Sequence, residues 1–107
     1  LVASALQSDR FVFEGFLPKK KGRQTRLETS STEPRTVVFY ESPHRLLRTL
    51  ADLTERCGPD RPVAVARELT KKYEEVQRGT LQEVHSYFAG YENIRGEIVV
   101  VLGADPA

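Results

Sequence analysis

Two short apolar runs in this sequence end abruptly in side chains that could do chemistry. The runs span residues 36–40 and 62–66, and each has the near-continuous apolar character of a strand buried in a sheet. The polar groups at these ends are Tyr40, Glu41 and Ser42 in the first case, and Arg67, Glu68 and Thr70 in the second. In open α/β sheets, ligands bind at the carboxyl ends of strands. Two such ends in one small domain predict half of a binding crevice.

The two carboxylates, Glu41 and Glu68, indicate what kind of ligand such a crevice would favour. A ligand with hydroxyls, an amine or the amino group of adenine would suit them, because ionised carboxylates accept hydrogen bonds. The plainer interpretation of Arg67 and Glu68 is a local ion pair, which contributes little to stability at a surface. Both interpretations stay open, since neither run identifies a reaction by itself.

A basic cluster follows the first predicted strand and could contact nucleic-acid phosphates. Its members are Lys19, Lys20, Lys21, Arg23 and Arg26. Gly22 allows the loop to move, and the release of counterions would favour phosphate binding. No aromatic residues alternate with these cations, so any contact is expected with backbone phosphates rather than with bases. The alternative is a solvated loop without a partner.

The sequence disfavours several other kinds of site. It contains no GxGxxG or Walker motif for phosphates, and one cysteine with two histidines at no ligand spacing predicts no metal site. His44 is expected in the first turn of a helix and His85 beside an apolar helix face, so both are interpreted as structural or solvent-facing. Cys57 is expected to pack as a small hydrophobic residue rather than act as a nucleophile.

The composition indicates one soluble globular domain with a modest core. The chain has 107 residues, of which 29% are charged and 39% hydrophobic, and its net charge is +1. No apolar run approaches the roughly 20 residues that span a bilayer. The single cysteine cannot form an internal disulfide, which fits a reducing cytoplasm, so a cytoplasmic location is expected. The chain has no methionine and begins in a helix-like segment, Leu1–Leu6, so we expect it to be part of a longer protein.

The pattern of apolar residues and breakers predicts eight elements. Strands are expected over residues 11–17, 36–40, 62–66, 75–79 and 97–102, and helices over residues 23–31, 42–57 and 80–89. Gly15 indicates a bulge or a close backbone approach in the first strand. Ser42 and Pro43 fit the N-cap and first position of the second helix, and Thr80 with Glu83 forms a capping box. The expected fold class is α/β, with a mixed sheet of about five strands and helices packed on its faces.

Several motifs, taken in order, carry a resemblance to a known family. They are the segments 8–11, 14–23, 33–36, 39–47, 65–71, 78–79 and 96–99, which include Phe-Tyr-Glu-Ser-Pro-His-Arg and Ala-Arg-Glu-Leu-Thr-Lys. Together they resemble the ribosomal RNA small subunit methyltransferase I family, within the tetrapyrrole-methylase-like class of S-adenosylmethionine enzymes. The Phe-Tyr-Glu-Ser motif distinguishes the chain from corrin and porphyrin methylases.

The resemblance implies a two-domain enzyme that methylates the ribose 2′-hydroxyl of a cytidine in 16S rRNA, with S-adenosylmethionine held between its domains. Residues 9–107 resemble the C-terminal α/β domain and residues 1–8 the end of the interdomain helix. The N-terminal domain with its glycine-rich loops has no counterpart in this chain. By motif position, the resemblance assigns cofactor contact to Phe39, Tyr40, Glu41, Ser42, Ala66, Arg67, Glu68, Gly96 and Glu97. The catalytic base stays open between Glu41, Glu68 and a group in the N-terminal domain.

The expected partners are the small ribosomal subunit with its 16S rRNA, the protein's own N-terminal domain, and a second copy of the chain. Without the partner domain, Tyr40 and Arg67 would be uncovered, as would Phe11 or Phe16 if the first strand lies near an edge of the sheet. Exposed apolar patches favour self-association. The fragment alone is expected to be inactive. Two alternative functions remain: a non-catalytic RNA- or protein-binding module, and a methyltransferase that acts on a small tetrapyrrole.

Overall fold

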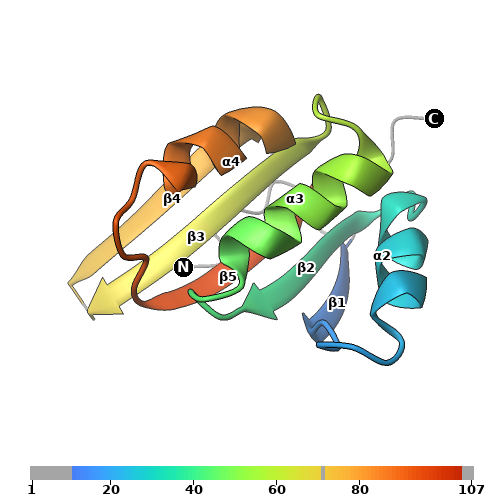
Figure 1. The fold of residues 1–107 in the computed structure, drawn as a ribbon, viewed down its shortest axis with the longest axis horizontal. Helices are drawn as coiled ribbons and strands as arrows, with labels where there is room; N and C mark the ends of the chain where they lie inside the picture. The colour runs from blue at the N-terminus through green and yellow to red at the C-terminus, as the bar shows by residue number, and fades with distance from the viewer. Residues whose placement is uncertain (1–10, 71, 105–107) are drawn as a thin grey trace.

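The computed structural model describes residues 11–70 and 72–104, so the helix end expected at residues 1–8 lies outside the described residues. The elements in chain order are β1 (Phe11–Phe16), α2 (Arg23–Ser31), β2 (Thr36–Glu41), α3 (Leu46–Cys57), β3 (Pro62–Thr70), β4 (Tyr73–Thr80), α4 (Leu81–Ala89) and β5 (Glu97–Leu102). Figure 1 shows these helices in front of a single twisted sheet. The order and type of the predicted elements are confirmed.

The sheet has five strands in the order β1-β2-β5-β3-β4. β1 pairs with β2 in parallel, and the remaining neighbours are antiparallel, so the prediction of a mixed five-stranded sheet is confirmed. β5 lies between β2 and β3 and runs opposite to both. Its first residues therefore pair with the last residues of β2 and β3: Ile98 lies opposite both Glu41 and Arg67. The polar carboxyl-terminal ends of β2 and β3 thus lie on either side of the start of β5, at one end of the sheet.

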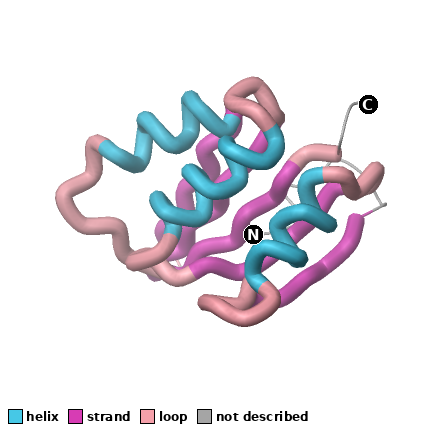
Figure 2. Tube along the Cα trace, turned by 45° about the vertical axis from the view of Figure 1, so that its right-hand side comes forward, coloured by secondary structure: helices cyan, strands magenta, loops and turns pink. Residues whose placement is uncertain are grey.

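One large core lies between the sheet and the three described helices. The buried side chains of this core are Leu27 from α2, Leu46, Leu50 and Leu53 from α3, and Leu81, Val84 and Phe88 from α4, packed on Val37, Phe39, Val63, Val65, Ile98, Val100 and Leu102. Because successive strand residues point to opposite faces, Val38, Ala64, Ala66, Val99 and Val101 form a second cluster behind the sheet. Both Figure 1 and Figure 2 place the described helices on the same side of the strands.

Local sequence signals account for two details of this architecture. Gly15 adopts a φ of +68°, a backbone conformation that glycine reaches without strain, and the β1–β2 register shifts there, as a bulge requires. At the start of α4 the Thr80 hydroxyl accepts a hydrogen bond from the Glu83 amide at 3.1 Å. The Glu83 carboxylate accepts one from the Thr80 amide at 2.9 Å. The predicted bulge and capping box are both confirmed.

Two predicted boundaries are wrong by four residues each. α3 begins at Leu46 rather than at Ser42, and residues 42–45 form a separate turn closed by the Arg45 amide and the Ser42 carbonyl at 3.1 Å. Serine and proline are favoured at the first two positions of a β-turn as well as at a helix start, so the same signal fits both structures. His44 is therefore exposed in this turn, outside the helix.

The second wrong boundary concerns β3, which runs on through Arg67 and Glu68 to Thr70 instead of ending at Ala66. Arg67 lies directly opposite Glu75 of β4, and opposite charges facing each other across two strands stabilise the pairing. The strand can therefore carry a charge in its interior, which its apolar pattern alone did not indicate.

No described helix is long and apolar enough to cross a membrane.

Candidate functional site

A pocket of about 450 Å³ opens at the end of the sheet where β1 and β2 finish and β5 begins. Its lining residues are Phe16, Tyr40, Glu41, Ser42, Pro43, Gly96, Glu97, Ile98 and Val99. They come from the ends of β1 and β2, the start of β5, and the segments that follow β2 and precede β5. The volume falls within the range of roughly 300–1,000 Å³ that is usual for small-molecule sites.

The apolar wall of the pocket is built by sheet register. Phe16 lies opposite Tyr40, and Tyr40 lies opposite Val99, so the three side chains follow one another across β1, β2 and β5 on the face away from the described helices. The rings of Phe16 and Tyr40 have their centroids 5.4 Å apart. Phe16 is 66% exposed and Tyr40 is 42% exposed, so both rings can contact a ligand or a covering domain.

Gly96 and Glu97 form a second part of the lining, at the point where the chain enters β5. Gly96 adopts a φ of +102°, a conformation that a residue with a Cβ atom rarely adopts. The glycine therefore lets the chain turn sharply into β5 while keeping the backbone open toward the pocket. Sequence reasoning assigned these two residues to the cofactor only through the family resemblance.

Glu41 is buried where β2 leaves the sheet, and its carboxyl is held by neighbours from α2 and α3. Burial raises the pKa of Glu41, against hydrogen bonds from Thr49 and the Ser42 amide and the charges of Arg23 and Arg45, which lower it. Arg45 Nε lies 4.0 Å from Oε1 of Glu41. The carboxyl is thus fixed on the helix side of the sheet, with a proton affinity above that of a free glutamate, while the residue itself lines the pocket where β2 ends.

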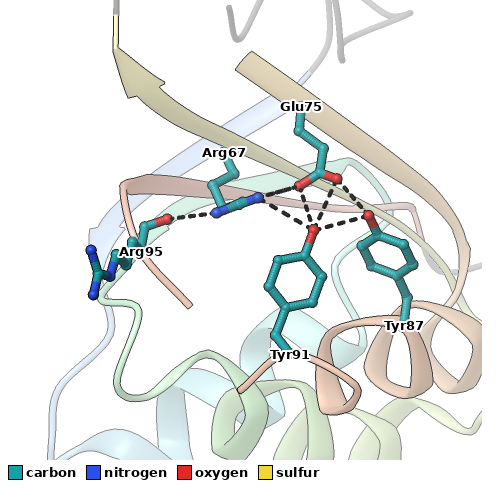
Figure 3. Close-up of polar contacts among 5 residues, drawn as sticks. All are labelled: Arg67, Glu75, Tyr87, Tyr91 and Arg95. Carbon is teal, nitrogen blue, oxygen red and sulfur yellow. Dashed lines mark hydrogen bonds and ion pairs between the residues drawn. The ribbon is translucent and has the colours of Figure 1, made fainter. Parts of the chain in front are cut away.

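Arg67 lies on the helix side of the sheet in a polar cluster, drawn in Figure 3. Nε and Nη2 donate to Oε1 of Glu75 at 3.0 and 2.8 Å, and Nη1 donates to the Arg95 carbonyl at 3.1 Å. Only 5% of the residue is exposed. The expectation that Arg67 would be uncovered is therefore wrong. Its side chain forms a buried ion pair with Glu75 rather than the surface pair with Glu68.

The structure brings five of the nine predicted cofactor residues together in the pocket: Tyr40, Glu41, Ser42, Gly96 and Glu97. The others do not line it. Phe39 packs in the core under the helices, Ala66 is buried on the opposite face of the sheet, and Glu68 lies opposite Glu97 in the β3–β5 ladder. The lining also includes Phe16, Pro43, Ile98 and Val99, which were not predicted as cofactor contacts. The β1–β2–β5 register would have indicated them, but that register is not readable from the sequence.

The basic cluster divides into exposed and structural residues. The three lysines, Lys19–Lys21, lie exposed in the loop between β1 and α2, and the Lys19 carbonyl accepts a hydrogen bond from Arg45 at 3.4 Å. Arg23 is buried and paired with Asp52, so its place in the predicted RNA surface is wrong. Arg26 is exposed, and its Nη1 lies 2.5 Å from a carboxylate oxygen of Glu14.

Cys57 is partly buried against the main core, as expected of a small hydrophobic residue. His85 is half-buried on α4, beside its apolar face. Among residues 11–70 and 72–104, no group of three or more His, Cys, Asp or Glu side chains could hold a metal ion.

The family model and the relatives that match this chain are all methylases by name. Residues 3–85 match the family model described as Tetrapyrrole (Corrin/Porphyrin) Methylases. The chain is 49% identical over 104 residues to the ribosomal RNA small subunit methyltransferase I of Pseudomonas aeruginosa, covering 95% of this chain and 37% of the relative. It is 50% identical over 109 residues to the protein of the same name from Synechocystis sp., covering 99% of this chain and 38% of the relative. The chain thus spans little more than a third of these relatives.

Solved structures share the fold at low sequence identity. The methyltransferase CobJ matches 95% of this chain and 45% of its own, with a TM-score of 0.67 and 21% identity. A uroporphyrin-III C-methyl transferase from Thermus thermophilus, complexed with S-adenyl homocysteine, matches 95% of this chain and 48% of its own, with a TM-score of 0.61 and 18% identity. From the family match and the shared fold, we conclude that the chain belongs to the tetrapyrrole (corrin/porphyrin) methylase family and is similar along nearly its whole length to the ribosomal RNA small subunit methyltransferase I proteins.

Proposed function

We propose that this chain is the C-terminal domain of an S-adenosylmethionine-dependent methyltransferase that modifies the ribose 2′-hydroxyl of a cytidine in 16S rRNA. In this proposal an N-terminal domain precedes the chain, and the pocket at the sheet edge is one wall of the cofactor cleft between the two domains. The identity of 42–50% to several ribosomal RNA small subunit methyltransferase I proteins supports the choice of substrate class.

The single observation that carries the proposal is the composition of the pocket. An aromatic and aliphatic wall from Phe16, Tyr40 and Val99 lies beside the exposed Glu97, and Glu41 also lines the pocket, with its carboxyl buried on the helix side of the sheet. An apolar wall suits the base and the thioether carbons of the cofactor, and carboxylates suit its amino and hydroxyl groups. The donor set therefore fits S-adenosylmethionine, and Tyr40 to Ser42 with Gly96 and Glu97 would hold it.

The chemistry asks little of this domain beyond positioning. S-adenosylmethionine supplies an electrophilic methyl group on a sulfonium. The ribose oxygen must approach that carbon in line with the breaking carbon–sulfur bond, and the hydroxyl proton must leave. Glu41 lines the pocket with a raised pKa, whereas Glu68 does not line it. Of the two candidates, only Glu41 lines the pocket, and its carboxyl is buried on the helix side of the sheet. A base supplied by the N-terminal domain fits the proposal equally well.

The lysine loop offers a surface for the RNA substrate next to this pocket. Arg45 donates to the Lys19 carbonyl and belongs to the turn at residues 42–45, which also contributes Ser42 and Pro43 to the pocket. Exposed lysines at this position would meet phosphates of an rRNA strand whose target ribose enters the cleft. This arrangement would place electrostatic attraction and methyl transfer side by side.

The test is calorimetric titration of S-adenosylmethionine into the full-length protein and into the chain of residues 1–107. We expect binding by the full-length protein and none by the chain alone, because the chain supplies one wall only. Tyr40→Ala in the full-length protein should raise the Kd about tenfold, equal to ~1.4 kcal/mol. Phe11→Ala is the matched control: Phe11 is also 42% exposed, but it lies at the other end of β1.

Two results would count against the proposal. One is equal affinity of the isolated chain and the full-length protein, which would show that the site is complete in this domain. The other is a full-length protein that does not bind S-adenosylmethionine. Two of the solved structures of similar fold are named for other substrates, cobalt precorrin-4 and uroporphyrin-III. At 14% and 18% identity they support the fold alone, so a small tetrapyrrole substrate is an outcome for the activity assay to detect.

A further inference from the structure

We propose that Arg67 is a positioning residue, which clamps the segment between α4 and β5 at both ends and so fixes Gly96 and Glu97 in the pocket wall. The clamp itself is argued from contacts within the chain. Its consequence for ligand affinity rests on the proposed function. Arg67 was predicted as a cofactor contact, but its side chain does not line the pocket, and its guanidinium is turned toward protein partners instead.

The C-terminal end of the segment is held by a hydrogen bond to its backbone. Nη1 of Arg67 donates to the carbonyl of Arg95 at 3.1 Å, and Arg95 directly precedes Gly96. Figure 3 shows this carbonyl turned toward Arg67, while the Arg95 side chain extends away from the cluster. Because the contact is to the backbone, it fixes the path of the chain just before the φ of +102° at Gly96.

The N-terminal end of the segment is held by the Tyr91 hydroxyl. Nη2 of Arg67 lies 3.3 Å from this hydroxyl, which in turn lies 3.1 and 3.2 Å from the two carboxylate oxygens of Glu75. The Arg67 guanidinium carbon also lies 5.0 Å from the centroid of the Tyr91 ring, within cation–π distance. One guanidinium group therefore contacts both Tyr91 and Arg95, four residues apart.

The charges in this cluster are paired, because the Arg67 guanidinium lies against the Glu75 carboxylate, and this pairing holds the Arg67 contacts in place. Burial alone would raise the pKa of Glu75, but hydrogen bonds from Tyr87, Arg67 and Tyr91 outweigh it and hold the pKa below its ordinary value. The hydrogen bond to Glu75 raises the pKa of Tyr87, so its phenol stays a donor. All three guanidinium nitrogens have partners, which a buried charge requires.

The other end of the same sheet provides a natural comparison. Arg61 lies just before β3, and its Nε donates to the carbonyl of Gly103, just after β5, at 2.9 Å. Arg61 and Arg67 are each 5% exposed. Each therefore holds a backbone carbonyl within two residues of an end of β5, but only the Arg67 contact adjoins the pocket. Substitution of Arg61 separates loss of a buried arginine from loss of the pocket clamp.

The experiment compares Arg67→Lys with Arg61→Lys in the full-length protein. Lysine keeps the charge but lacks the planar fork that reaches Glu75 and the Arg95 carbonyl together. We expect Arg67→Lys to speed hydrogen–deuterium exchange of residues 92–97 and to raise the Kd for S-adenosylmethionine about tenfold, while rRNA affinity stays unchanged. Arg61→Lys should leave that Kd within about twofold, even where the two variants unfold at similar temperatures.

A second variant covers the case in which Arg67→Lys does not fold. Tyr91→Phe removes only the hydroxyl at the other end of the segment, and we expect faster exchange over residues 92–97 with a Kd raised about threefold. Unchanged exchange in both variants would overturn the clamp. Faster exchange with an unchanged Kd would overturn its role in binding. The exchange measurement needs no cofactor. A wild-type protein that fails to bind S-adenosylmethionine would therefore contradict the proposed function, and the exchange rates of residues 92–97 would still show whether Arg67 holds this segment.

Discussion

Nη2 of Arg23 lies 2.9 Å from Oδ2 of Asp52, and this ion pair joins α2 to α3. The same nitrogen donates to the Thr49 hydroxyl at 3.1 Å, and Nη1 donates to the Pro18 carbonyl at 3.3 Å. Thr49 is in turn hydrogen-bonded to Glu41 in the pocket wall. An arginine that the sequence groups with exposed lysines is therefore part of the packing that supports the pocket.

Arg23→Met should lower the free energy of unfolding by roughly 1–3 kcal/mol, because it leaves the buried Thr49 and the partly buried Asp52 without their donor. Urea denaturation of the chain measures this loss, with Lys20→Met as an exposed control that should change little. Equal stability of the two variants would contradict the structural role. The salt dependence of rRNA binding by full-length Arg23→Met should match wild type wherever the variant is folded.

Replacing Lys19, Lys20 and Lys21 together with alanine should weaken rRNA binding by the full-length protein and spare S-adenosylmethionine affinity. Each lost phosphate contact reduces the magnitude of the slope of log affinity against log salt by about 0.7 to 0.9, so loss of all three contacts should reduce it by about 2 to 3. Fluorescence anisotropy at several salt concentrations measures it. The triple arginine variant keeps the charge and should keep the slope. If the alanine variant retains wild-type affinity and slope, the RNA surface lies elsewhere.

The buried carboxyl of Glu41 and the partly buried carboxyl of Glu75 should influence stability in opposite directions as pH changes. The pKa of Glu75 is lowered on folding, so its contribution is complete above its ordinary value of 4.5 and is lost as pH falls through the lower folded value. Burial raises the pKa of Glu41, so the folded state binds this proton more tightly than the unfolded state does. The folded state therefore loses stability as pH rises from 4.5 through the higher folded pKa.

Denaturation of wild type, Glu75→Gln and Glu41→Gln between about pH 3 and pH 8 checks both signs. The advantage of wild type over Glu75→Gln should shrink toward acid. The stability of Glu41→Gln relative to wild type should grow as pH rises above 4.5. Parallel curves for all three proteins would show that neither carboxyl changes its proton affinity on folding.

The isolated chain should self-associate through the edge strand β1. Phe13 and Phe16 are 53% and 66% exposed there, and both pack against Tyr40, so they form one aromatic surface beside a strand edge that no other described strand pairs with. Light scattering at increasing concentration should show a dimer that Phe13→Lys with Phe16→Lys abolishes. A wild-type chain that stays monomeric at high concentration would contradict this.

Features encoded within a few neighbouring residues were predictable from the sequence. The capping box at Thr80 and Glu83, the bulge at Gly15 and the apolar strands need only local information. The turn at Ser42 and Pro43 was misassigned because those residue types favour both a turn and a helix start. Local preference alone could not choose between a turn and a helix start at these residues, since both structures favour serine and proline there.

The candidate site was predictable only in part, because it depends on which strands become neighbours. The polar ends at Tyr40 and Glu41 were visible in the sequence, but Phe16 and Val99 join them only through pairing of β1, β2 and β5. Arg67 was assigned to a ligand from its place at the end of an apolar run and from its motif position. Its partner Glu75 lies on a different strand, so their pairing was not apparent from that run. Whether a charge at a strand end faces a ligand or another strand is a tertiary property.

The most direct test of the proposed function is methyl transfer by the full-length protein. Small ribosomal subunits from cells that lack the enzyme are incubated with S-adenosylmethionine carrying a tritiated methyl group, and the 16S rRNA is digested to nucleosides. We predict that the label elutes with 2′-O-methylcytidine and that Tyr40→Ala greatly reduces it. Label in a base-methylated nucleoside, or label on a corrinoid with none in rRNA, would contradict the account.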